Sequence, residues 1–177
     1  MKAAFETRVQ AIKWSNYSNP CWPDHQSLIS GLLIQIRRGD NDVALEAAQR
    51  LWDIAAHQGN VGSSAVPTAG FLIEMLEELP PRIQDECLDT LFQFSNYLTI
   101  PDELWCAELR KVFWAALPVF KRLAASPDDD VSCFSEMIIE NIEASAPLKT
   151  EPGGPPNGGP PKQQDNSATD GVPPAVS

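Results

Sequence analysis

The sequence predicts an all-α fold, arranged as a short α-solenoid of about three antiparallel helix pairs after an N-terminal helix. Three observations predict it. Apolar residues between positions 24 and 143 recur at helical spacing, and no run alternates with period two. Residue types that begin and end helices flank these runs. The apolar pattern also repeats after 40 residues, which is typical of helix pairs that complete each other's cores.

The seven helices are expected at residues 3–14, 24–38, 41–57, 64–78, 81–97, 102–124 and 128–143. The second, third and fourth helices have polar residues at their starts, whose side chains can accept free backbone N–H groups: Asp24, Asp40 or Asn41, and Ser63 or Ser64. The expected ends are marked by Gly39, Gly59 and Pro80, since glycine adopts a left-handed cap and the residue before a proline avoids helical geometry.

The last three helices have prolines at informative places. Pro81 fits the first position of the fifth helix, where its missing N–H costs nothing. Pro118 lies inside the sixth helix, which should kink or split there. The seventh is preceded by Ser126 as a hydroxyl cap, Pro127 in the first turn and Asp128 where the helix dipole favours an acid.

Matching apolar residues lie 40 positions apart in the predicted pairs. The first helices align Leu32 with Leu72 and Val112, and Leu33 with Ile73 and Phe113. The second helices align Leu51 with Leu91 and Val131, and Ile54 with Phe94 and Phe134. We therefore expect equivalent helices of successive pairs to stand side by side.

The run VALEAAQRLWDIAAHQG, followed by AVPTAGFLIEML, resembles the bacterial HEAT-like repeat proteins, and the resemblance covers about residues 24–97. In that family a helix ending at a His-Gln-Gly corner leads into a helix with an Ala-Val-Pro start. The resemblance implies a short curved stack that binds other macromolecules. Many small acidic proteins of this kind look like immunity proteins encoded beside secreted toxins, and others are adaptors.

Two regions of different composition are expected. Residues 1–144 form the helical domain, and residues 145–177 form a disordered tail rich in proline and glycine. Half of the 16 prolines fall in the last 31 residues, where too little apolar surface remains to offset the entropy of ordering.

The charge of the helical domain restricts its partners. Residues 1–148 hold 11 Lys and Arg against 21 Asp and Glu, a net charge of −10. Such a surface repels phosphates, so we expect no nucleic acid or anionic membrane partner and a basic protein partner instead. The N-terminal segment lacks a signal-peptide core, and no run approaches the roughly 18 apolar residues of a membrane span, so a cytoplasmic location is expected.

We expect no catalytic residues, no metal site and no cofactor. Cys21, Cys87, Cys106 and Cys133 match no zinc or redox spacing, and small buried apolar residues are their simplest interpretation. His25 and His57 lie 32 residues apart without a metal-binding pattern. His57 and the residues after it are interpreted as a structural corner between two helices, with Gly59 in a left-handed cap.

The candidate partner-binding residues are carboxylates on the outward face of the second helices and two aromatics: Asp42, Glu46, Asp53, Asp85, Glu86, Asp89, Glu136, Glu140, Trp14 and Trp22. If the helices stand side by side, the carboxylates form one acidic surface. The alternative is an ordinary solvated face. The tryptophans either cap the first pair or anchor a partner, whereas Trp52 and Trp114 fit the apolar stripes of the core.

Two functions are left open by these features. The first is an immunity protein or inhibitor that occludes a basic toxin domain through its acidic surface. The second is a general adaptor or scaffold in which the C-terminal tail acts as a flexible tether. Both are non-catalytic protein-binding roles.

Overall fold

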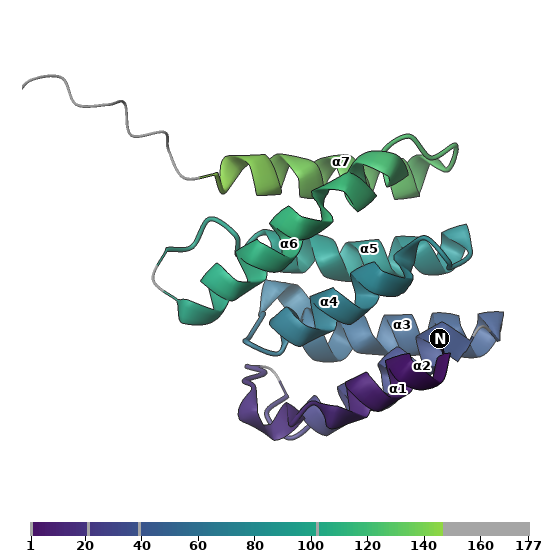
Figure 1. Ribbon diagram of the computed structural model, residues 1–177, viewed down its shortest axis with the longest axis vertical. Coiled ribbons are helices and arrows are strands. Elements are labelled where there is room, and N and C mark those ends of the chain that lie inside the picture. Colours follow the sequence, from purple (N-terminus) through teal and green to yellow (C-terminus); the bar gives the residue numbers. More distant parts are fainter. Residues whose placement is uncertain (1, 21, 39, 102, 147–177) are drawn as a thin grey trace, which may run out of the picture. The chain divides into compact units, whose positions relative to one another are not determined.

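Seven α-helices and two short 3-10 helices make up the part of the chain that the computed structural model describes, residues 2–20, 22–38, 40–101 and 103–146 (Figure 1). In chain order they are α1 (Lys2–Ala11), η1 (Trp14–Asn16), α2 (Gln26–Arg38), α3 (Asn41–Ala55), η2 (His57–Gly59), α4 (Ala65–Leu76), α5 (Pro81–Ser95), α6 (Leu104–Leu123) and α7 (Asp129–Ala144). The predicted all-α class is confirmed, with ends shifted by up to three residues. The predicted tail lies outside the described residues from position 147 onward.

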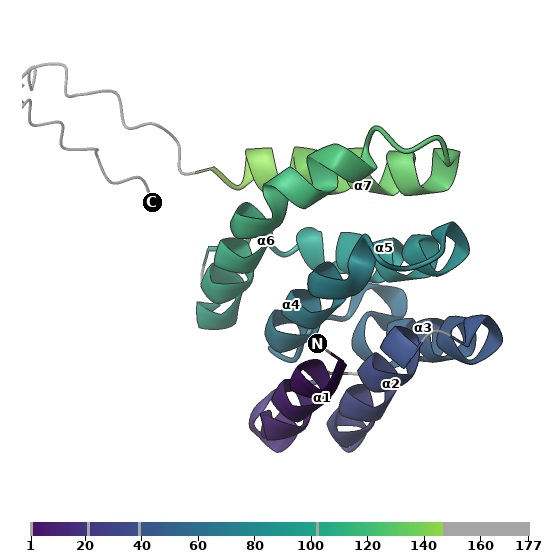
Figure 2. The same cartoon turned by 45° about the vertical axis from the view of Figure 1, so that its right-hand side comes forward.

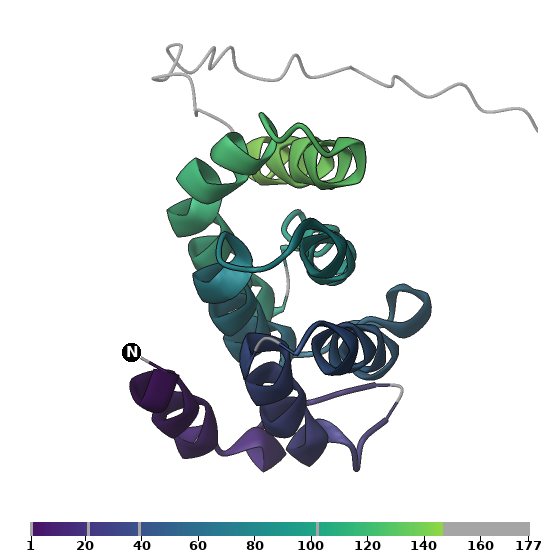
Figure 3. The same cartoon turned by 90° about the vertical axis from the view of Figure 1, so that its right-hand side faces the viewer.

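The helices are arranged in two layers. Helices α2, α4 and α6 pack successively in one layer, and α3, α5 and α7 pack in the other (Figure 2). Each layer is joined to the other through the pairs α2–α3, α4–α5 and α6–α7. Helix α1 packs against α2, and Figure 3 shows it at the same end of the stack as the first pair. Equivalent helices therefore stand side by side, as the repeat predicted.

The core lies between the two layers and contains the repeated apolar positions. Each of the twelve residues aligned by the repeat is either buried or packed against the buried core. Phe113 and Phe120 stack within α6, with ring centroids 5.8 Å apart. The buried hydroxyls of Thr68 and Ser135 donate to backbone carbonyls one turn earlier, so these polar groups are satisfied inside the core.

Several predicted helix caps are correct and others are wrong. Asp40 is the N-cap of α3, although its side chain accepts no cap hydrogen bond, and Pro81 is the first residue of α5. Helix α2 begins at Gln26 and not at Asp24. The two remaining predicted start and end residues, Gly39 and Asp102, lie outside the described residues.

The serine hydroxyls that were predicted as caps do not cap their helices. Ser64 is the N-cap residue of α4, but its hydroxyl makes no cap hydrogen bond. The Ser63 hydroxyl instead accepts from the backbone N–H of Ser18 at 2.8 Å. At α7 the cap is Asp128, which accepts from the N–H of Val131, while Ser126 accepts from the N–H of Asp128. Of these hydroxyls, only that of Ser63 is held by a contact with a distant part of the chain.

Helix α6 continues through Pro118 and is not split. Figure 2 shows that its axis bends along its length, which agrees with the kink predicted for a proline inside a helix.

The corner after α3 has the predicted left-handed glycine, but α3 ends at Ala55, so His57 and Gly59 lie in η2 and not at the end of α3. Gly59 has φ 73° and Gln58 has φ 53°, so both residues take the left-handed conformation. The Tyr97 hydroxyl donates to the Gly59 carbonyl at 2.6 Å and ties the corner to the end of α5.

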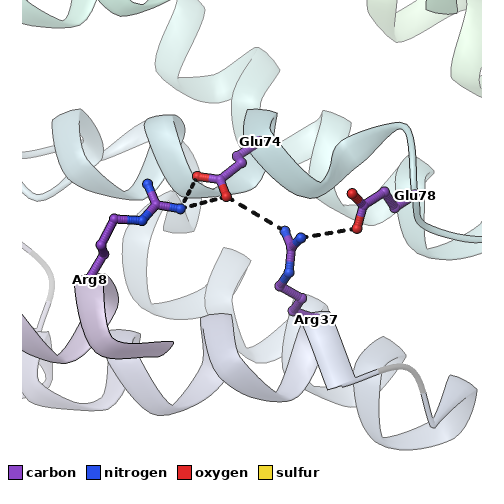
Figure 4. A network of polar contacts seen from close by, with 4 residues as sticks. All are labelled: Arg8, Arg37, Glu74 and Glu78. Carbon is purple, nitrogen blue, oxygen red and sulfur yellow. Dashed lines mark hydrogen bonds and ion pairs between the residues drawn. The ribbon is translucent and has the colours of Figure 1, made fainter. Parts of the chain in front are cut away.

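An ion-pair network joins the first helices (Figure 4). Arg8 of α1 donates to both carboxylate oxygens of Glu74 on α4 at 2.6 Å. Arg37 of α2 donates to Glu78 at 3.1 Å, and its guanidinium carbon lies 4.6 Å from the centre of the Phe5 ring. The network therefore links α1, α2 and the segment that contains α4.

Candidate functional site

Within their helices the two layers carry opposite charge, while Glu77 and Glu78, directly after α4, pair with Arg122 and Arg37. The helices α2, α4 and α6 contain six Lys and Arg and two Asp and Glu, a net charge of +4. The helices α3, α5 and α7 contain two Arg and eleven Asp and Glu, a net charge of −9. The acidity of the chain is thus concentrated on one side of the folded unit, which we call the acidic layer.

The densest part of the acidic layer lies where α5 meets the start of α7. Partial burial raises the pKa of the Asp85 carboxyl, and the negative charges of Asp130, Glu86, Asp128 and Asp89 raise it further, in that order. Helices α5 and α7 pack against each other, and these residues lie on α5 and at the start of α7. These five residues are named the acidic cluster.

The sequence positions of the cluster explain its geometry. Asp85 and Asp89 are one turn apart on α5, so both point to the same side. Asp128 caps α7 and Asp130 lies in its first turn, where the positive end of the helix dipole favours acids. Asp85, Glu86 and Asp89 are among the residues that the sequence predicts, whereas Asp128 and Asp130 are not, because charge at a helix start is also typical of solvated termini.

The other predicted carboxylates are exposed but lie at separate places in the acidic layer. Asp42, Glu46 and Asp53 lie along α3, and Glu136 and Glu140 lie along α7. Across the layer, Gln49 of α3 donates to Glu86 of α5 at 2.9 Å. The structure thus places all eight on helices of one layer, with the closest grouping at α5.

The predicted aromatic residues divide into a buried and an exposed group. Trp14 is only 6% exposed and donates from Nε1 to the Val9 carbonyl, so it packs as part of the cap and is not an exposed anchor. Trp22 is 44% exposed, and its Nε1 donates to the Asp53 carbonyl at 3.1 Å. Trp52 packs against the core as expected, whereas Trp114, also predicted to be buried, is 37% exposed.

Both histidines lie beside Trp22, which the sequence did not predict. His25 stacks on Trp22 with ring centroids 5.4 Å apart. His57 Nδ1 lies 3.8 Å from a carboxylate oxygen of Asp53. A hollow of about 320 Å³ is lined by these residues together with Arg50 and Ile54. Residues separated by 32 positions meet here because α2 and α3 are antiparallel neighbours.

The described residues include no group of three or more His, Cys, Asp or Glu side chains placed to hold a metal ion. Cys87 and Cys106 are buried as predicted, and burial raises the pKa of both thiols. Cys133 is exposed, so its predicted burial is wrong. It follows Ser132 on the outward side of α7, and Cys21 lies outside the described residues.

Comparison with protein-family models, curated proteins and solved structures gives no match to this chain. Across the described ranges, none of the helices combines the length and apolar character needed to span a membrane.

Replacing Asp85 by asparagine is expected to stabilise the protein at neutral pH. Folding raises the pKa of this carboxyl, so its ionised form destabilises the native state at pH values above that pKa. The penalty disappears when the pH falls below the pKa of the unfolded chain, about 3.9, because the carboxyl is then protonated in both states. We expect a gain of at most about 1 kcal/mol at pH 7. Thermal unfolding at pH 7 and pH 3.5 measures it.

The matched control is Glu140→Gln, which removes one charge from an exposed position of the same layer and should change stability by less than about 0.5 kcal/mol. Equal effects of the two substitutions at pH 7, or a gain for Asp85→Asn that persists at pH 3.5, would contradict the local repulsion.

Proposed function

We propose that this protein is a non-catalytic binding protein that captures a basic protein partner on its acidic layer. The observation that supports the proposal is the separation of charge, with −9 on α3, α5 and α7 and +4 on α2, α4 and α6. A one-sided field orients an approaching cation and accelerates its association.

The acidic cluster is the proposed centre of this surface. A basic partner that places Lys or Arg beside Asp85 relieves the repulsion among the five carboxylates, so binding lowers an energy that the free protein carries. Exposed charge pairs contribute mainly to the association rate. The interaction is therefore expected to weaken steeply as the salt concentration rises.

The finer proposal is an inhibitor of the immunity-protein type, which would block a basic toxin domain by covering it. The resemblance of residues 24–97 to HEAT-like proteins and the net charge of the domain support this proposal. Occlusion would need only the helical unit. A chain truncated after residue 144 should therefore retain its affinity, whereas loss of affinity would favour the adaptor with a C-terminal tether.

The decisive experiment is capture of the partner by the full-length chain from cells that produce it, followed by kinetics with the purified partner. Asp89→Lys combined with Asp130→Lys should slow association at least about tenfold at low salt, and the difference should shrink at high salt. The matched control, Glu103→Lys with Glu108→Lys, reverses two exposed charges outside the acidic layer. An acidic partner, or equal association rates for the two double variants, would refute the proposal.

A further inference from the structure

A groove runs between α2 and α3 on the side of α3 that faces away from α5. One hollow of about 140 Å³ is lined by Leu32 and Gln35 of α2 and by residues of α3 from Val43 to Arg50. The hollow of about 320 Å³ beside Trp22 continues along α3 from Arg50 to His57. Arg50 lines both hollows, so they adjoin at its side chain, and we call the two together the α2–α3 groove.

Exposed apolar side chains gather at this groove. Of the six large hydrophobic residues that are exposed in the described chain, Trp22 and Val43 line the hollows, with exposed fractions of 44% and 45%. Leu28, 38% exposed, lies one turn before Leu32 on the same face of α2. Apolar surface concentrated in this way is typical of binding sites.

The charges along the groove form a pattern. Glu46, Arg50 and Asp53 follow one another at one-turn spacing on α3 and give the order negative, positive, negative. No ion pair or hydrogen bond of the Arg50 side chain is found among the described residues, although carboxylates flank it on the same helix. Its guanidinium is therefore available to an external carboxylate.

The internal repeat indicates what kind of element fits the groove. The face of α3 formed by residues 43, 46, 50, 53 and 57 corresponds, 40 positions on, to residues 83, 86, 90, 93 and 97. In the second pair this face packs against a helix, since Glu86 accepts from Gln49 of α3 and the Tyr97 hydroxyl contacts the corner after α3. The equivalent residues of α3 line the groove.

We propose that the α2–α3 groove binds an amphipathic α-helix of a partner protein, with an acidic residue opposite Arg50 and a basic residue one turn to either side of it. The basic residues face Glu46 and Asp53, and the apolar stripe of the helix packs on Trp22, Leu28 and Val43. The eleven residues of α3 from Val43 to Asp53 span about 15 Å, so the bound helix has about three turns.

This site is separate from the acidic cluster, and the proposal does not depend on the function proposed above. The Trp22 side chain is preorganised in the free protein, because its indole N–H donates a hydrogen bond to the Asp53 carbonyl. A preorganised aromatic side chain loses little entropy when a partner covers it.

The test uses a displayed library of fourteen-residue helical peptides, selected on the full-length protein. Selected peptides should share the order basic, acidic, basic at one-turn spacing. Arg50→Glu should weaken their binding at least tenfold, and replacing the peptide's acidic residue by arginine should restore binding to Arg50→Glu. Arg82→Glu is the matched control, since it makes the same charge change in the first turn of α5, outside the groove.

Trp22→Ala should also weaken peptide binding, whereas Trp114→Ala, at the other exposed tryptophan considered above, should not. Selection of no groove-dependent peptide, or equal loss with Arg82→Glu, overturns the proposal. So does a concentration-dependent dimer that Arg50→Glu dissociates, because the occupant is then a second copy of the chain. Asp89→Lys with Asp130→Lys changes only the acidic cluster and should leave peptide binding intact. Peptide binding by this double variant therefore tests the groove independently of the acidic-layer proposal.

Discussion

Replacing Gly62 by alanine is expected to destabilise the protein by about 3 kcal/mol, the upper part of the usual range for overpacking. A Cβ atom at this position would lie 2.4 Å from the Ser18 carbonyl oxygen and 2.7 Å from Cδ of Pro20. The obstacle is backbone, and it is fixed by hydrogen bonds between Ser18 and Ser63 in both directions. The clash therefore cannot be relieved by moving a flexible side chain.

Chemical denaturation and thermal unfolding of Gly62→Ala measure this effect, and a loss of about 3 kcal/mol should lower the melting temperature by about 6 to 12 °C. Gly31→Ala and Gly70→Ala are matched controls, because a Cβ at either helical position meets no atom within 4 Å. Each control should stabilise the protein by about 0.4 to 1 kcal/mol. Stabilisation by all three substitutions would show that the loop before α2 does not pack on the corner as described.

Replacing Arg37 by alanine is expected to cost about 2 kcal/mol or more of folding free energy, because its hydrogen bond to a charged group and its contact with an aromatic ring are both lost. The side chain is only 10% exposed, contacts the Phe5 ring and pairs with Glu78 and Glu74 (Figure 4). Its loss removes the contacts of α2 with Phe5 of α1 and with Glu74 and Glu78, while the Arg8–Glu74 pair still joins α1 to α4.

Arg37→Lys should recover only part of the loss, since an ammonium group cannot pair with two carboxylates and stack on a ring with the planar geometry of a guanidinium. Arg38→Ala, which removes the neighbouring and much more exposed arginine, is the control and should cost less than about 1 kcal/mol. Hydrogen exchange should show the added opening in α1. Equal losses for the two alanine variants would contradict the role given to Arg37.

The two proposed binding surfaces share one helix. The acidic layer and the α2–α3 groove share α3, and Glu46 and Asp53 belong to both. The acidic cluster itself lies at α5 and the start of α7, whereas the groove faces away from α5. The variants at Arg50 and at Asp89 with Asp130 distinguish these contributions.

Local sequence patterns determined the helices and the core of this protein. Periodic apolar residues, Pro81 and Gly59 predicted elements and corners that the structure contains, because these signals act through the backbone of a few neighbouring residues. The 40-residue repeat also predicted which helices stand side by side. The curved HEAT-like array that the resemblance implies stays a prediction.

Only the tertiary structure decided how the polar and aromatic residues are used. Ser63 was predicted as a cap and instead holds the loop at Ser18, while Trp14 is buried and Trp114 is exposed. The two histidines meet Arg50 at one groove, and Asp128 and Asp130 join Asp85 across two helices. The physical reason is that burial, charge repulsion and groove formation depend on distances between helices, and residues far apart in the chain acquire those distances only when the layers pack.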